Sequence, residues 1–246
     1  MATAPPEDQR RLLEVQALDT RLQQLAHQRR NHPSLATVVE LESRMADLHG
    51  SLVDSRTAVA DLEREVTKAE TDVEQVRTRA ERDQQRLDSG SLGAKDAQAV
   101  VSELESLARR QGVLEETQLE IMERLEAHQT SLGEVEAAYG ELRAAKEKAE
   151  SERDAAFAEI DAARREVDEQ RAAAADGLDA SLVTLYDRLR SQLGGLGAAA
   201  LRGNRCEGCR LELNPGDLAT ARGAAPDQVV RCEECGRILV RDADAA

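Results

Sequence analysis

Apolar residues recur along the chain at alternating intervals of three and four, which is the spacing of a heptad repeat. The repeat is first continuous after Pro33, where thirteen of fifteen such positions are apolar and most intervening residues are charged or polar. Pro33 also suits the first turn of a helix, so the pattern predicts a long helix from this point. The fifteen positions of this first seam are Val38, Leu41, Met45, Leu48, Leu52, Ser55, Val59, Leu62, Val66, Ala69, Val73, Val76, Ala80, Asp83 and Leu87.

Turn residues interrupt the repeat at 88–93, Asp-Ser-Gly-Ser-Leu-Gly, and a second seam follows in which ten of thirteen positions are apolar. Two helices of matching periodicity joined by a short glycine-containing turn are expected to fold back as an antiparallel hairpin. Disorder, which the net charge of −15 would also fit, does not keep a seam over such a length. The second seam contains Val100, Leu104, Leu107, Gln111, Leu114, Gln118, Ile121, Leu125, His128, Leu132, Val135, Tyr139 and Leu142.

Shorter segments flank the hairpin. An early helix with apolar residues between Leu12 and Leu25 is expected to pack against the end of the second arm, around 156–167. Asp176-Gly177 is expected to end the long helix, and an amphipathic helix around 182–193 precedes a glycine-rich break at 194–197. We therefore divide the chain into a coiled-coil hairpin at 1–177 with its turn near 88–94, a short helix and linker at 178–201, and a small domain at 202–246.

Composition limits the function classes. Charged residues make up 33% of the chain and aromatic residues 1%, whereas a compact enzyme core of this size normally contains many rings. No phosphate-binding loop, nucleophile elbow or His-Glu-x-x-His motif occurs. We therefore expect a protein that is not an enzyme.

Charge and hydropathy also bear on location and partners. No apolar run approaches the roughly 20 residues that span a bilayer, and the acidic start lacks the features of a signal peptide. A cytoplasmic protein without membrane association is expected. The residues before Arg202 include 26 basic and 40 acidic ones, a balance of −14, so this part of the chain should repel phosphate backbones. The sequence does not specify an oligomeric state.

Four cysteines stand in two Cys-x-x-Cys pairs 22 residues apart, Cys206 with Cys209 and Cys232 with Cys235. One such turn can present two thiolates to a tetrahedral ion at about 2.3 Å, and two turns complete the coordination. The pattern predicts one structural Zn²⁺ held by all four. Two disulfides, an iron–sulfur cluster and a redox dithiol are the alternatives, and the expected cytosolic setting disfavours disulfides.

The residues around the cysteines suggest a β-ribbon. Strands are expected at 210–213, 228–231 and 237–240, with a turn at 214–216. Gly208 and Gly236 are expected to relieve the tight backbone by adopting positive φ. The fold class is therefore mainly α: a long antiparallel coiled-coil hairpin followed by a small C-terminal β zinc ribbon.

The C-terminal region resembles a known family at these residues. The stretches 206–215, Cys-Glu-Gly-Cys-Arg-Leu-Glu-Leu-Asn-Pro, and 229–240, Val-Val-Arg-Cys-Glu-Glu-Cys-Gly-Arg-Ile-Leu-Val, are similar to the bacterial four-cysteine zinc-ribbon family with a long N-terminal helical hairpin. Many members have Tyr where this chain has Val240. The resemblance implies a non-enzymatic protein. Described relatives are linked to chaperoning a flagellar sigma factor, to binding mRNA and to type III secretion.

The arginines around the cysteines leave two hypotheses open. Arg205, Arg210, Arg231 and Arg237 could contact a partner or a phosphate, because guanidinium groups match phosphate oxygens. Against phosphate, acidic residues are interspersed, and no aromatic side chain after Tyr186 offers a stacking surface for a base. The first hypothesis is an adaptor or chaperone that docks protein partners. The alternative is a regulator that binds RNA or DNA through the ribbon and its arginines.

Overall fold

The computed structural model describes residues 2–241. Residue 1 of the expected hairpin domain and residues 242–246 of the expected ribbon lie outside the described part. The chain forms two compact units, one from residues 36–150 and the other from residues 1–35 together with 151–246. No helix in the described chain is both long enough and apolar enough to cross a membrane.

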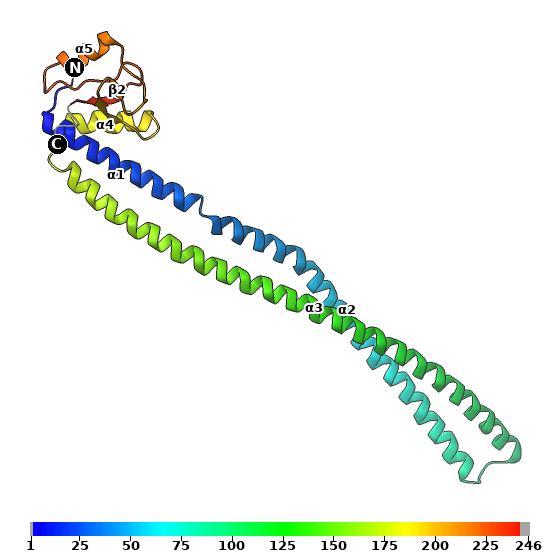
Figure 1. Ribbon diagram of the computed structural model, residues 1–246. Coiled ribbons are helices and arrows are strands. Elements are labelled where there is room, and N and C mark those ends of the chain that lie inside the picture. The colour runs from blue at the N-terminus through cyan, green and yellow to red at the C-terminus, as the bar shows by residue number, and fades with distance from the viewer. Residues whose placement is uncertain (1, 242–246) are drawn as a thin grey trace. The chain divides into compact units, whose positions relative to one another are not determined.

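The 36–150 unit is the predicted antiparallel hairpin. It is formed by α2 (Pro33–Asp88) and the first part of α3 (Ala94–Ala175), which run side by side on either side of the turn (Figure 1). Gly90 in that turn has φ of 65°, a conformation that glycine adopts without steric strain. The buried side chains of this unit fall on the predicted seams or, for Ala149, one heptad beyond Leu142: Val38, Leu52, Val59, Leu62, Ala69, Val73, Val76, Leu107 and Ala149.

Ion pairs connect the two arms of the hairpin on both sides of the seam. Arg56 contacts Glu136 at 2.7 Å on one side, and Arg79 contacts Glu103 at 2.7 Å on the other. Because these pairs are largely exposed, each contributes at most about 1 kcal/mol. They report the alignment of the arms, whose stability comes from the apolar seam.

The other unit contains helices that precede and follow the hairpin in the sequence. Its helical part contains α1 (Pro6–Arg30), α4 (Ala180–Gln192) and the last turns of α3. The expected contact between the early helix and the end of the second arm is present. Arg29 pairs with Asp161 at 3.1 Å and lies 4.5 Å above the ring centroid of Phe157. Arg11 donates a hydrogen bond to the carbonyl of Ala174.

A three-stranded sheet completes this unit. Its strands are β1 (Ala198–Arg202), β2 (Arg205–Cys206) and β3 (Ile238–Val240), in the order β2-β1-β3. β1 runs antiparallel to β2 and parallel to β3. The helix α5 (Pro215–Gly223) lies between β2 and β3 in sequence.

The ribbon differs from the sequence-based expectation in four places. The strand expected at 210–213 is reduced to one bridge between Glu212 and Arg205, and that at 228–231 to isolated bridges and short contacts. The turn expected at 214–216 is the start of α5, because the Asn214 side chain accepts a hydrogen bond from the amide of Asp217 and Pro215 occupies the first turn. β1 lies in the segment expected to be a linker.

The core of this unit joins the helices to the sheet. One cluster of buried residues brings Leu12 and Val15 of α1 against Leu182 and Tyr186 of α4, together with Ile238 and other residues of β1 and β3. A second cluster surrounds the cysteines and includes residues of β1, α5 and β3. The sheet therefore contributes to both clusters, and the ribbon is packed against α1 and α4.

Candidate metal centre and the polar cluster beside it

The four cysteine thiols converge on one point. All four Sγ atoms lie within 4.8 Å of one another, and the Cys206–Cys235 and Cys209–Cys232 sulfurs are each 4.0 Å apart. A tetrahedral ion with bonds of about 2.3 Å would separate its sulfur ligands by about 3.8 Å. All four cysteines are free thiols. Their arrangement therefore fits one Zn²⁺ with four sulfur ligands, which is a structural rather than a catalytic site because it leaves no open position.

Both Cys-x-x-Cys turns use the same backbone hydrogen bonds. The amide of Cys206 donates to the carbonyl of Leu211, and the amide of Arg210 donates back to Cys206. In the second turn, the amide of Cys232 donates to Arg237 and the amide of Gly236 donates back to Cys232. The two halves of the site thus repeat one local structure, and these backbone hydrogen bonds hold the thiols in place independently of a metal.

The glycines of the two turns have different roles. Gly236 has φ of 73° as expected, but the matching position in the first turn is Arg210, with φ of 63°. Gly208 does not have the expected positive φ. Its role is steric, because a Cβ there would lie 2.8 Å from Cδ of Arg237 and 2.9 Å from Cβ of Ala199. A left-handed conformation costs a non-glycine residue about 1 kcal/mol, so the first turn is the strained one.

The surroundings of the thiols affect their ionisation in different ways. Burial raises the pKa of the Cys206 thiol, and it raises the pKa of Cys232 to about 12. Burial also disfavours the thiolate of Cys235, but hydrogen bonds from Arg237, Cys232 and Cys209 together outweigh it and lower this pKa to about 7. Zinc binds thiolates, so a bound ion would displace protons from these buried groups.

Most of the ribbon's arginines donate hydrogen bonds to backbone carbonyls. Arg231 donates to the carbonyl of Gly236, and Arg237 donates to the carbonyls of Leu196 and Leu193. Arg205 and Arg210 are exposed, and Arg205 lies 4.0 Å from Glu207. Of the four arginines singled out in the sequence, Arg231 and Arg237 thus hold loops together, and all except Arg237 are exposed. Arg241 donates to five carbonyls, those of Ala221, Ala224, Ala225, Pro226 and Gln228.

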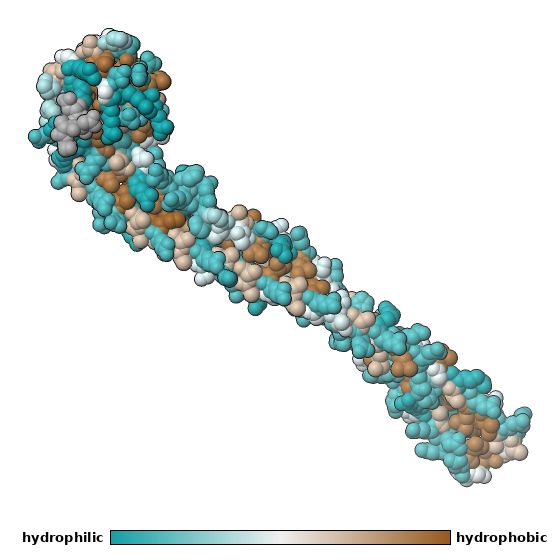
Figure 2. Space-filling model, in the orientation of Figure 1, coloured by the Kyte–Doolittle hydropathy of each residue, from teal (hydrophilic) through white to brown (hydrophobic). Residues whose placement is uncertain are grey.

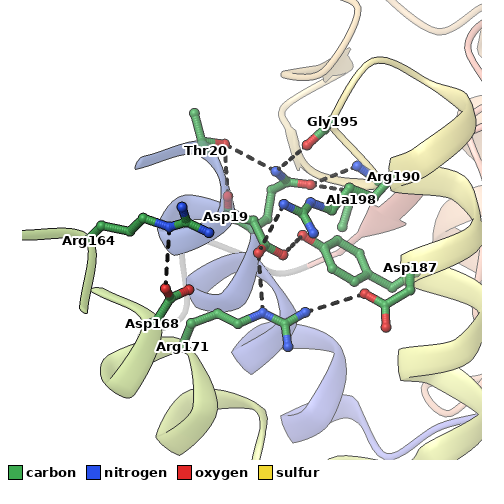
Figure 3. Close-up of polar contacts among 12 residues, drawn as sticks. Asp19, Thr20, Arg164, Asp168, Arg171, Asp187, Arg190, Gly195 and Ala198 are labelled. Carbon is green, nitrogen blue, oxygen red and sulfur yellow. Dashed lines mark hydrogen bonds and ion pairs between the residues drawn. The ribbon is translucent and has the colours of Figure 1, made fainter. Parts of the chain in front are cut away.

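A buried carboxylate lies where α1, α3 and α4 meet. Asp19 is 1% exposed and accepts a hydrogen bond of 2.7 Å from the hydroxyl of Tyr186. Its other oxygen lies 3.2 Å from both Arg171 and Arg190 (Figure 3). We call these four residues the Asp19 cluster. Since a buried carboxylate is costly unless paired and hydrogen-bonded, the cluster fixes how the three helices pack.

Gln16, one turn before Asp19, connects the same helix to the sheet. Its side-chain nitrogen donates to the carbonyl of Gly195, and its oxygen accepts from the amides of Gly197 and Ala198 at the start of β1. Sequence reasoning missed both residues. The available signal was the spacing Leu12, Val15, Gln16 and Asp19, which places two polar side chains on the apolar face of α1.

Comparison with known proteins places both parts of the chain. Residues 15–194 match the CT398-like coiled-coil hairpin domain, and residues 205–239 match the C4-type zinc ribbon domain. An uncharacterised protein of Mycobacterium tuberculosis is 40% identical over 233 residues, 95% of each chain. One from Mycobacterium leprae is 29% identical over 92% of this chain and 97% of its own.

Solved structures share the fold over nearly the whole chain. A structure from Mycobacterium smegmatis has a TM-score of 0.84 and 38% identity, and covers 97% of this chain and 100% of its own. CT398 from Chlamydia trachomatis has a TM-score of 0.66 at 16% identity, covering 96% and 98%. The first similarity extends to sequence, whereas the second is one of fold.

Proposed function

The chain belongs to the CT398-like coiled-coil hairpin family and carries a C4-type zinc ribbon, and we propose that it is a non-enzymatic adaptor or chaperone that docks protein partners. In this proposal Cys206, Cys209, Cys232 and Cys235 hold one structural zinc ion. The ion stabilises the ribbon, and the hairpin presents the docking surface.

The surface of the hairpin is the observation that carries this proposal. Residues 36–150 include 26 acidic and 15 basic residues, a balance of −11, which opposes nucleic-acid binding along this unit. Several large apolar side chains nevertheless remain exposed outside the seam, including Val39, Leu119 and Met122. Apolar patches alternate with polar surface in Figure 2. Exposed apolar groups with a polar rim are typical of protein interaction sites.

The alternative function rests on the ribbon. Arg205 and Arg210 are exposed, whereas the guanidinium groups of Arg231 and Arg237 already donate to backbone carbonyls, so the first two are more available to a phosphate. A regulator that binds RNA or DNA would use these two side chains. Such binding would weaken steeply as salt increases, because each phosphate contact releases counterions.

Capture from lysate with and without nuclease separates the two functions. For a protein adaptor, we expect a defined partner to survive nuclease treatment and to be retained when Arg205 and Arg210 are both changed to Glu. Submicromolar RNA or DNA binding at physiological salt that is lost in this double variant would instead establish the alternative. The matched control is Arg188→Glu with Arg164→Glu, which changes the charge equally at exposed helical positions away from the thiols.

A further inference from the structure

The hairpin has two distinct faces, each marked by ion pairs between its arms. With the core positions of each heptad named a and d, the e positions of the two antiparallel helices meet on one side of the seam and the g positions meet on the other. Two of the ion pairs, Arg56–Glu136 and Arg77–Glu115, join e positions, which lie four residues after an a position such as Leu52. Arg79–Glu103 and Arg124–Glu65 join residues on the opposite side. We call the side carrying the first two pairs the Met122 face, because Met122 has the same heptad position as Glu115.

Exposed apolar side chains concentrate on the Met122 face. Among the described residues of the 36–150 unit, six large apolar side chains are exposed. Val113 has a heptad position on the other side of its helix. The other five are at position e, like Met122, or at position b, one residue after an a position. Position b lies next to e around the helix and on the same side. These five are Val39, Val53, Val101, Leu119 and Met122.

Acidic side chains surround Leu119 and Met122 on this face. The stretch between the Arg56–Glu136 and Arg77–Glu115 pairs contains ten residues at these two heptad positions, and none is Lys or Arg. Leu119 is 60% exposed and Met122 44% exposed. Four of the remaining eight are exposed glutamates with no ion pair among the described residues. The acidic patch consists of Leu119 and Met122 with Glu63, Glu70, Glu74 and Glu126.

We propose that the acidic patch docks a basic amphipathic helix of a partner protein. The apolar side of such a helix would cover Leu119 and Met122, and its Lys or Arg side chains would reach the surrounding glutamates. Methionine suits this contact because its flexible thioether adapts to different apolar surfaces. Docking of helices into apolar surfaces is a common mode of peptide recognition. The inference rests on the proposed adaptor function and names the chemistry of the partner.

Charge complementarity selects this occupant over two others. A second copy would bring another hairpin unit of charge −11 against the patch, and like charges across an interface are unfavourable. A nucleic acid would place phosphates beside Glu63 and Glu70, which is unfavourable for the same reason. A positively charged helix gains from both the apolar contact and the glutamates.

Binding of a synthetic peptide to the full chain tests the proposal. The probe is a fluorescent helical peptide of leucine and lysine with its leucines on one face, and its control has the same composition with the leucines spread around the helix. Anisotropy should show binding of the first peptide and at least about tenfold weaker binding of the control. Leu119→Gln with Met122→Gln should weaken the first peptide by a similar factor. Val113→Gln, an equally exposed change on the other side of the helix, should leave binding unchanged.

The charge contribution has its own matched variants. Glu63→Gln with Glu70→Gln should weaken binding and make it less sensitive to salt. Glu120→Gln with Glu134→Gln, two exposed glutamates at the heptad position of Val113 on the other side of the helix, should do neither. Peptide binding that is absent, or equally strong in the patch variants and their controls, would overturn the proposal. So would self-association of the wild type in sedimentation that is abolished by Leu119→Gln with Met122→Gln, because the patch would then join two copies. A lysate partner retained by the patch variants would leave the adaptor function standing while removing this site.

Discussion

Asp19 is the only buried charged side chain in the described part of the chain. Its negative charge is balanced by Arg171 and Arg190, each about a quarter exposed, and by the hydroxyl of fully buried Tyr186. Arg171 also contacts Asp187 of α4. Removing one member of such a group leaves the others buried without a partner, and that loss usually exceeds the net value of the intact contacts.

Substitution within the Asp19 cluster should therefore cost more than substitution of an exposed ion pair. We expect Asp19→Asn to reduce the free energy of opening α4 by about 3 kcal/mol and Tyr186→Phe by about 1–2 kcal/mol. Asp168→Asn, which breaks an exposed pair with Arg164, should cost less than about 1 kcal/mol. Native-state hydrogen exchange of α4 measures all three. Equal effects of Asp19→Asn and Asp168→Asn would contradict this account.

Alkaline pH should weaken the same cluster. Burial, followed by the hydrogen bond to Asp19, raises the pKa of Tyr186 well above its ordinary value of 10.0. The folded state therefore keeps this phenol protonated at a pH where the unfolded chain releases the proton. The resulting stabilisation is complete below pH 10 and is lost as pH rises above it. Urea unfolding on either side of pH 10 should show a larger loss for the wild type than for Tyr186→Phe, and identical losses would exclude this cause.

At the scale of elements, the two cysteine turns offer a paired comparison. They share one hydrogen-bond pattern, but a left-handed residue is Gly236 in one and Arg210 in the other. Gly236→Ala should destabilise the ribbon by about 1–2 kcal/mol, and Arg210→Gly should stabilise it by up to about 1 kcal/mol. The rate at which a chelator removes zinc measures both effects: it should increase for Gly236→Ala and decrease for Arg210→Gly. A slower loss for Gly236→Ala, or a faster loss for Arg210→Gly, would show that backbone strain is not the controlling factor.

The elements that depend on local patterns could be predicted from the sequence. The hairpin follows from its seams, and the convergence of four thiols follows from the cysteine spacing. β1 could not be predicted, because Ala-Ala-Ala-Leu-Arg has weak strand propensity and its pairing partner β3 begins 40 residues after it does. α5 begins where the sequence predicts a turn, because Asn214-Pro215 suits both a turn and a helix start.

Contacts between distant segments could not be predicted from the sequence either. Asp19 meets Tyr186 across a sequence separation of 167 residues, and no periodic pattern predicts such a pair. Polar residues on the apolar face of α1 indicate that some partner exists, but they do not identify it. The sequence does not define the Met122 face, because the ion pairs between the arms determine which sides of the two helices lie together.

At the scale of the whole molecule, the zinc ribbon is coupled to the helices beside it. A ribbon of this size has too small a core to fold alone, so a bound metal should provide much of its stability. Ile238 and Val240 of β3, which follows the second cysteine pair, are buried in the same cluster as Leu12 and Tyr186. Loss of the metal should therefore disturb more than the ribbon.

Removal of zinc should loosen the ribbon together with α1 and α4 while leaving the 36–150 hairpin intact. We expect a chelator, or Cys232→Ser, to reduce amide protection in β1, β3, α1 and α4, because the helices lose the apolar surface of the sheet. The hairpin should keep its protection and most of the helical signal in circular dichroism, because its seam is its own core. Hydrogen exchange with mass spectrometry resolves these regions, and cadmium or cobalt added back should restore protection in the wild type but not in Cys232→Ser. Full protection of α1 and α4 after verified metal removal would show that the helices hold together without the ribbon.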